Sequence, residues 1–134
     1  MKRTSKRNRL ANLGNKYQGS RKRVLCLCSA GMLRSPTAAV ILASEFGCNT
    51  RAAGLTDEYA LIPVDDALLT WADEVVVMDK WQMLAVGTHC EDIDLPVPVI
   101  HNFDIPDEFE YMQDELVAMI RQTALTLKFK RETK

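Results

Sequence analysis

Cys28 and Arg34 are the residues whose types and spacing could do chemistry: they form a Cys-X5-Arg pattern within VLCLCSAGMLRSPTAA. A guanidinium is a planar fork that matches two phosphate oxygens, and the backbone N–H groups of a short arc can point toward the same anion. A thiol in such positive surroundings favours its thiolate form, which is the nucleophile. The pair therefore predicts a phosphate-binding loop that carries a nucleophilic cysteine.

The segments on either side of this loop have the character that phosphate binding requires. The apolar run 24–27 before Cys28 is typical of a buried strand. After Arg34, Ser35 and Pro36 form a helix-start pair, with Ser35 predicted as the N-cap and Pro36 at the first helical position. Strand, loop and helix N-terminus thus follow in order. The predicted oxyanion contacts are Ser29, Ala30, Gly31, Met32, Leu33, Arg34 and Ser35.

Strand-like and helix-like patterns alternate along the chain. Pro96 and Pro98 place the last strand at an edge of the sheet, while Gly47 and Gly87 are predicted to end two of the helices. The pattern predicts strands over 23–28, 48–53, 74–78 and 97–103, and helices over 36–46, 65–71, 80–86 and 114–129. Such alternation favours a three-layer α/β/α sandwich around a four-stranded parallel sheet. Ligands of such sheets bind at the carboxyl ends of the strands, where Cys28 is expected.

Four segments of the chain together resemble a known family. CSAGMLRSPTAA, RAAGL, WADEVVVMDK and FDIPDEFEYM occur in an order similar to that of low-molecular-weight protein tyrosine phosphatases, in particular a compact bacterial branch of predicted phosphatases. The resemblance covers roughly residues 23–127 and implies the fold of that family. It also implies roles: Cys28 attacks phosphorus to form a cysteinyl-phosphate, Arg34 binds the phosphoryl group, and Ser35 hydrogen-bonds Cys28 and supports its thiolate.

The loop departs from the wider family at two positions. Gly31 stands where many members carry an Asn whose side chain supports the loop; glycine adopts positive φ without that support, so the loop can still form. Leu33 stands where many members carry a second Cys that traps the oxidised nucleophile as a disulfide. The resemblance therefore implies that this route of redox protection is absent, and Cys26 is too constrained along its strand to replace it.

Cleavage of a phosphate ester also needs an acid that protonates the leaving oxygen. Asp104 and Asp107, in Asp104-Ile105-Pro106-Asp107, are the two candidates. Counting back from the last helix slightly favours Asp104, whereas Phe109, two residues after Asp107, resembles the aromatic residue that follows the acid in the family. Both carboxylates stay candidates at this point.

The leading interpretation is a cysteine-dependent phosphatase for phosphotyrosine or a related phosphomonoester, on a phosphorylated protein or a small molecule. The alternatives are an arsenate reductase that uses the same loop, and a non-catalytic phosphate- or nucleic-acid-binding protein. Arsenate reduction needs a relay pair of cysteines downstream, where this chain offers Cys90, with Cys48 elsewhere. The cysteines make no paired zinc spacing, so neither metal nor cofactor is expected.

Charge divides the chain into two parts. Residues 1–23 contain nine Lys and Arg and no acid, so the rest of the chain contains eight basic residues and all eighteen acidic ones. We therefore predict a flexible basic tail over 1–22, which could bind nucleic acid or an acidic partner, and a phosphatase-like domain over 23–130. No apolar run approaches the ~20 residues of a membrane span and no secretory signal is evident, so a cytoplasmic location is expected.

Overall fold

One four-stranded parallel sheet positions the chemistry-bearing residues, as expected from the sequence. We describe the fold from a computed structural model, over residues 21–29, 34–55 and 64–127. Residues 1–20 of the predicted tail and loop residues 30–33 lie outside the described residues, whereas Lys22, predicted as the end of the tail, forms an ion pair with Glu74. The strands are β1 (Arg23–Cys28), β2 (Asn49–Gly54), β3 (Glu74–Val77) and β4 (Val99–Asn102), and the helices are α2 (Arg34–Phe46), α3 (Asp66–Trp71), α4 (Lys80–Asp92) and α5 (Asp114–Thr126).

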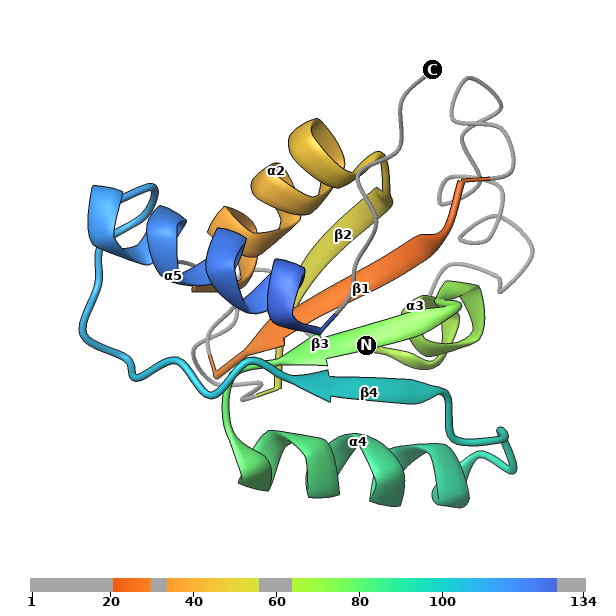
Figure 1. Cartoon of the computed structure of the whole chain (residues 1–134). Helices are drawn as coiled ribbons and strands as arrows, with labels where there is room; N and C mark the ends of the chain where they lie inside the picture. The colour runs from red at the N-terminus through yellow and green to blue at the C-terminus, as the bar shows by residue number, and fades with distance from the viewer. Residues whose placement is uncertain (1–20, 30–33, 56–63, 128–134) are drawn as a thin grey trace.

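The strands lie in the order β2-β1-β3-β4, so β1 is central and β4 is an edge strand (Figure 1). Cys28 pairs in register with Gly54 at the carboxyl end of β1, next to the end of β2. The last strand is shorter than predicted because Pro98 has no N–H to donate to a ladder. Beyond β4, Phe103 and Ile105 continue the attachment to the β3 segment through hydrogen bonds to Val77 and Met78 of 2.8 and 3.1 Å.

Helices cover both faces of the sheet, which confirms the three-layer sandwich (Figure 1). On one face, Val24, Cys26, Cys28, Val76 and Met78 pack against buried residues of α2 and α5. On the other face, the alternate strand residues pack against α3 and α4; these are Leu25, Leu27, Val75 and Val77. Both faces of β1 are thus buried, which is why its sequence is continuously apolar rather than alternating.

Helix α4 runs to Asp92, so the prediction that it ends at Gly87 is wrong. Gly87 lies within the helix, and Val86 and Cys90, one turn apart, are both fully buried. A single glycine costs a helix about 1 kcal/mol relative to alanine, less than burial of these two side chains contributes. Tertiary packing therefore keeps the chain helical at Gly87.

Most of the other elements also differ from the predictions by one or more residues at an end. Helix α2 begins at Arg34, two residues before the predicted start, so Ser35 lies inside the helix and is not its N-cap. Strand β2 is displaced by one residue, and the described part of the last helix ends at Thr126. The early start of α2 matters most, because it fixes Arg34 and Ser35 rigidly on the first helical turn.

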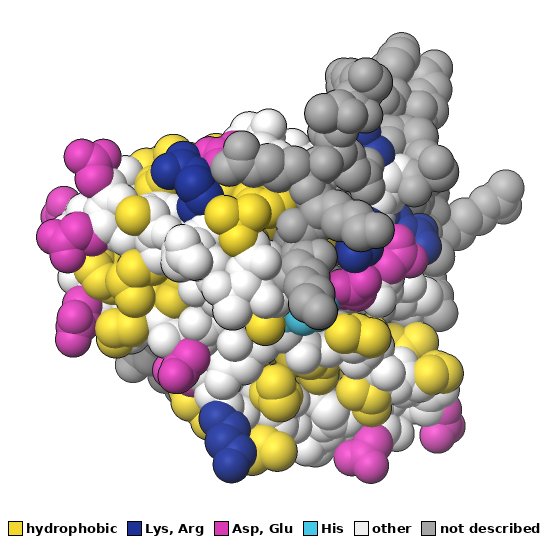
Figure 2. Space-filling view, viewed as in Figure 1, with side chains coloured by type: hydrophobic (Ala, Val, Ile, Leu, Met, Phe, Trp, Pro, Cys, Tyr) yellow, Lys and Arg dark blue, Asp and Glu magenta, His cyan; other side chains and the backbone are white. Residues whose placement is uncertain are grey.

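The surface of the described residues carries an acidic region beside the site. In the view of Figure 2, acidic side chains gather on the left, over α5 and the segment that precedes it. The exposed carboxylates of this part of the chain are Asp104, Asp107, Glu108, Glu110, Asp114 and Glu115. Across the described ranges, no helix is long and apolar enough to cross a membrane.

Candidate active site

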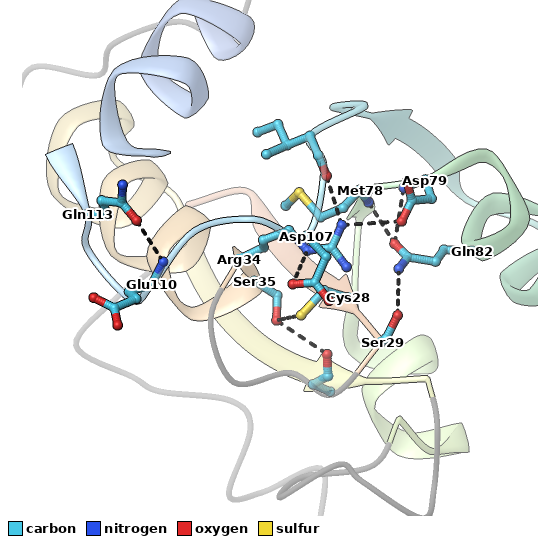
Figure 3. Close-up of polar contacts among 12 residues, drawn as sticks. Cys28, Ser29, Arg34, Ser35, Met78, Asp79, Gln82, Asp107, Glu110 and Gln113 are labelled. Atoms are coloured by element: carbon cyan, nitrogen blue, oxygen red, sulfur yellow. Dashed lines mark hydrogen bonds and ion pairs between the residues drawn. The ribbon is translucent and has the colours of Figure 1, made fainter. Parts of the chain in front are cut away.

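Cys28 is the last residue of β1 and is nearly fully buried. Its Sγ lies 3.2 Å from Ser35 Oγ, on the first turn of α2 (Figure 3). The Ser35 hydroxyl is also 3.5 Å from the Ala53 carbonyl on β2, so it is held between two neighbouring strands. The serine predicted to cap the helix instead contacts the predicted nucleophile, as the family resemblance implied.

Arg34 is the largest buried polar residue of the described chain, with 2% of its surface exposed. Its Nη1 donates to the Ile105 carbonyl at 2.8 Å and to Asp79 Oδ2 at 3.2 Å. Its Nε is buried and makes no hydrogen bond among the described residues; Asp107 Oδ1 lies 3.6 Å from it. A buried donor without an acceptor is costly, and an oxyanion placed there would supply one.

The two candidate acids occupy different environments. Asp107 projects toward Arg34 in Figure 3, and 65% of its side chain is exposed. Asp104 is exposed too, but its φ of 54° and the hydrogen bond from its N–H to Asn102 Oδ1 at 2.8 Å make it a turn residue. Aspartate tolerates this left-handed conformation better than most residues. Asp104 therefore shapes the turn that follows β4, while Asp107 is the carboxylate that reaches the arginine.

Two residues that follow β3 complete the described site. Asp79, the N-cap of α4, directs its carboxylate to Arg34. Gln82 is fully buried, and its Oε1 accepts hydrogen bonds from the backbone N–H groups of Met78 and Asp79 at 2.7 and 3.2 Å. Gln82 was missed from the sequence, although its spacing from Asp79 is that of a capping box.

The predicted oxyanion loop is described in part. Ser29, Arg34 and Ser35 lie beside Cys28, and Gln82 Nε2 donates to Ser29 Oγ at 3.5 Å. The predicted contacts of Ala30, Gly31, Met32 and Leu33 lie outside the described residues. Both ends of the loop are thus placed, and they bring the thiol and the guanidinium to the same edge of the sheet.

The other three cysteines are buried in the core, Cys26 and Cys48 on the same face of the sheet as Cys28 and Cys90 on the opposite face. Burial, together with neighbouring Cys48 and Cys28, raises the pKa of the Cys26 thiol far above its usual range. Burial also raises the pKa of Cys90, which packs on the opposite face of the sheet from Cys28. Neither thiol is therefore in a state suited to nucleophilic chemistry.

Both histidines contact carboxylates elsewhere in the fold. His89 lies 2.9 Å from Asp66 and joins α4 to α3, while His101 lies 2.6 Å from Glu74 and joins β4 to β3. Within the described ranges, no three His, Cys, Asp or Glu side chains gather as a metal site. The described part of the site contains a thiol, a guanidinium and two carboxylates.

Comparison with solved structures finds this fold in bacterial phosphatases. The tyrosine phosphatase Wzb from Escherichia coli K30, in complex with phosphate, superposes with a TM-score of 0.60 at 16% identity, over 80% of this chain and 96% of that one. The YwlE arginine phosphatase from Geobacillus stearothermophilus gives 0.57 at 20% identity, over 80% and 93% of the two chains.

A third similar structure has another activity. The thioredoxin-dependent arsenate reductase Cg_ArsC1' from Corynebacterium glutamicum gives a TM-score of 0.52 at 18% identity, over 92% of this chain and 68% of that one. No protein-family model and no curated protein matches the sequence. The shared feature is the architecture, and the chain therefore has the fold of the low-molecular-weight protein tyrosine phosphatases.

Proposed function

We propose that this protein is a cysteine-dependent phosphatase that hydrolyses phosphotyrosine or a related phosphomonoester. The observation that carries the proposal is the buried Arg34, whose Nε makes no hydrogen bond in the described chain and which adjoins Ser35, the partner of Cys28. A buried guanidinium held by Ile105 and Asp79 is preorganised for an anion, so it stabilises charge without rearranging. The similar phosphatase structures support the same activity.

The reaction takes two steps. The Cys28 thiolate attacks phosphorus, an S–P bond forms, and the bond from phosphorus to the ester oxygen breaks. The leaving oxygen takes a proton from a carboxylic acid, and water then attacks the cysteinyl-phosphate to release inorganic phosphate and the thiolate. Arg34 binds the equatorial oxygens through both steps, because its fork matches them.

We assign the role of proton donor to Asp107 rather than to Asp104, which reverses the slight preference drawn from the sequence. Asp107 approaches Arg34 and is open to water, so it can protonate a leaving group and then deprotonate a water molecule. Asp104 is committed to the turn through its positive φ. Asp107→Asn is expected to lower kcat by about 100-fold or more and to remove the alkaline limb of the pH–rate profile. Loss of that limb in Asp104→Asn instead would reverse the assignment.

Turnover of para-nitrophenyl phosphate tests the activity. We expect hydrolysis by the wild-type protein that is abolished in Cys28→Ser and in Arg34→Ala. Ser44→Ala is the matched control, because the Ser44 hydroxyl lies on the same helix and bonds only the Val40 carbonyl of its own turn among the contacts described. Equal turnover in wild type and Cys28→Ser contradicts the proposal.

Arsenate reduction is the second candidate, favoured by the similar arsenate reductase structure. It would require electrons to pass from the Cys28 adduct to another thiol. Cys90 is separated from Cys28 by the sheet, and Cys48 is buried, which argues against a relay within this chain. Thioredoxin-coupled reduction of arsenate by the wild-type protein, lost in Cys90→Ser, would support this candidate over the phosphatase.

A further inference from the structure

Gln82 is a fully buried amide whose polar atoms all face the candidate site. Its Oε1 accepts from two consecutive backbone N–H groups, those of Met78 and Asp79, at 2.7 and 3.2 Å. Its Nε2 donates to Ser29 Oγ at 3.5 Å, as Figure 3 shows. The carbonyl end and the amino end of the side chain thus hold different segments of the chain.

These contacts fix the orientation of the amide. An oxygen that accepts from two N–H groups cannot be exchanged for the NH2 group without losing both bonds, so the donor must face Ser29. Gln82 itself has no exposed surface, while its partner Ser29 is half-buried. The amide therefore links the end of β3 to Ser29, the residue that directly follows Cys28.

The Gln82 amide connects the segment that carries the predicted nucleophile with the segment that binds Arg34. Ser29 directly follows Cys28, while Asp79, which Gln82 holds through its backbone, carries the carboxylate that binds Arg34. We propose that Gln82 is a positioning residue, whose amide holds Ser29, beside the nucleophile, to the strand end that orients the arginine.

This inference deepens the proposed function and rests on it for its catalytic meaning. Ser29 accepts from Gln82, so its own hydroxyl proton stays available for another acceptor. A carboxylate at position 82 would draw that proton toward itself and would add a negative charge beneath the loop. Both effects oppose the thiolate and the bound phosphate dianion.

Gln82→Glu tests the proposal with little change of shape. Glutamate keeps an oxygen for the N–H groups of Met78 and Asp79, and either residue suits this position of a capping box, so α4 is expected to stay capped. We expect the rate of Cys28 alkylation by iodoacetamide at pH 7 to fall at least about fivefold, and kcat/KM for para-nitrophenyl phosphate to fall at least as much. Half-maximal alkylation should move to higher pH.

Leu84→Glu is the matched control, because it adds the same charge to the same helix at a side chain that is 64% exposed. It is expected to alkylate at the wild-type rate. The proposal is overturned if Gln82→Glu reacts within twofold of the wild type, or if Leu84→Glu slows the thiol as much as Gln82→Glu does. Thermal unfolding midpoints, expected to be similar in the two variants, check that both are folded.

Ser29→Ala reaches the same contact from the loop side and leaves α4 untouched, so it decides the matter if Gln82→Glu does not fold. It removes the acceptor of the amide and should lower binding of orthovanadate at least about threefold; unchanged binding overturns the proposal. Alkylation and vanadate binding need no turnover. If the wild-type protein hydrolyses no phosphomonoester, the proposed function fails while these two measurements still decide the role of Gln82.

Discussion

Removing the Ser35 hydroxyl should make the Cys28 thiolate less favourable, and the two contacts of this hydroxyl limit the size of the effect. The hydroxyl has one proton and two neighbouring acceptors, Cys28 Sγ at 3.2 Å and the Ala53 carbonyl at 3.5 Å. When Cys28 is a thiolate, the proton turns to sulfur, and a hydrogen bond to a charged group contributes about 1.5–3 kcal/mol. The long bond to Ala53 that is given up contributes about 0.5 kcal/mol. The net preference for the thiolate is about 1–2.5 kcal/mol, or roughly 5- to 70-fold in its population.

Ser35→Ala is therefore expected to slow iodoacetamide alkylation of Cys28 by about 5- to 70-fold at neutral pH, with the gap closing at high pH, where the thiolate forms regardless. Labelling is read by mass spectrometry of the Cys28 peptide, and Cys28→Ser gives the background from the buried thiols of Cys26, Cys48 and Cys90. A rate equal to the wild type across the pH range would refute the reasoning, because it would mean that the Ser35 hydroxyl keeps donating to the Ala53 carbonyl and not to sulfur.

Further predictions concern stability and can be measured by urea denaturation. Gly87→Ala should raise the free energy of unfolding by about 0.5–1 kcal/mol, since the residue lies within α4 and a Cβ there meets nothing within 4 Å. The hydrogen bonds from Arg23 lower the pKa of Asp73, so this pair stabilises the fold above the ordinary carboxylate pKa and loses its effect as the pH falls through the lowered value. Asp73→Asn should accordingly cost no more than about 1 kcal/mol at pH 7, because the pair is half exposed, and progressively less as the pH falls through the lowered pKa of Asp73. Ile120→Ala, at a fully buried position of α5, should cost about 2–5 kcal/mol, whereas Leu125→Ala on the same helix, 46% exposed, should cost far less.

The sequence predicted the order of the elements because burial leaves a direct trace in residue type. The continuous apolar run before Cys28 indicated a strand buried on both faces, and β1 is that strand. Gly87 was misjudged because its local preference is overridden by contacts of Val86 and Cys90 with other elements. Ser35 was misjudged because serine before proline is typical of a helix start, and the sequence pattern does not show that its hydroxyl faces sulfur.

The site itself was predictable only where the motif is local. Cys28 and Arg34 flank one short loop, so their spacing already places them near each other. The carboxylates come from distant segments: which of Asp104 and Asp107 reaches the arginine depends on the backbone of a single turn, fixed by a positive φ. Gln82 showed its capping role in its spacing from Asp79, but its contact with Ser29 depends on how α4 lies across the sheet.

Arg34 is also a fastening point for the whole end of the sheet. It begins the helix that follows β1, and it binds Asp79 after β3 and the Ile105 carbonyl after β4, so the segments that leave three adjacent strands converge on one guanidinium. Because these segments share one arginine, the site can move only as far as the carboxyl end of the sheet moves. Heat or urea should then abolish catalysis and unfold the protein at the same midpoint, and an oxyanion bound at Arg34 should shift both together.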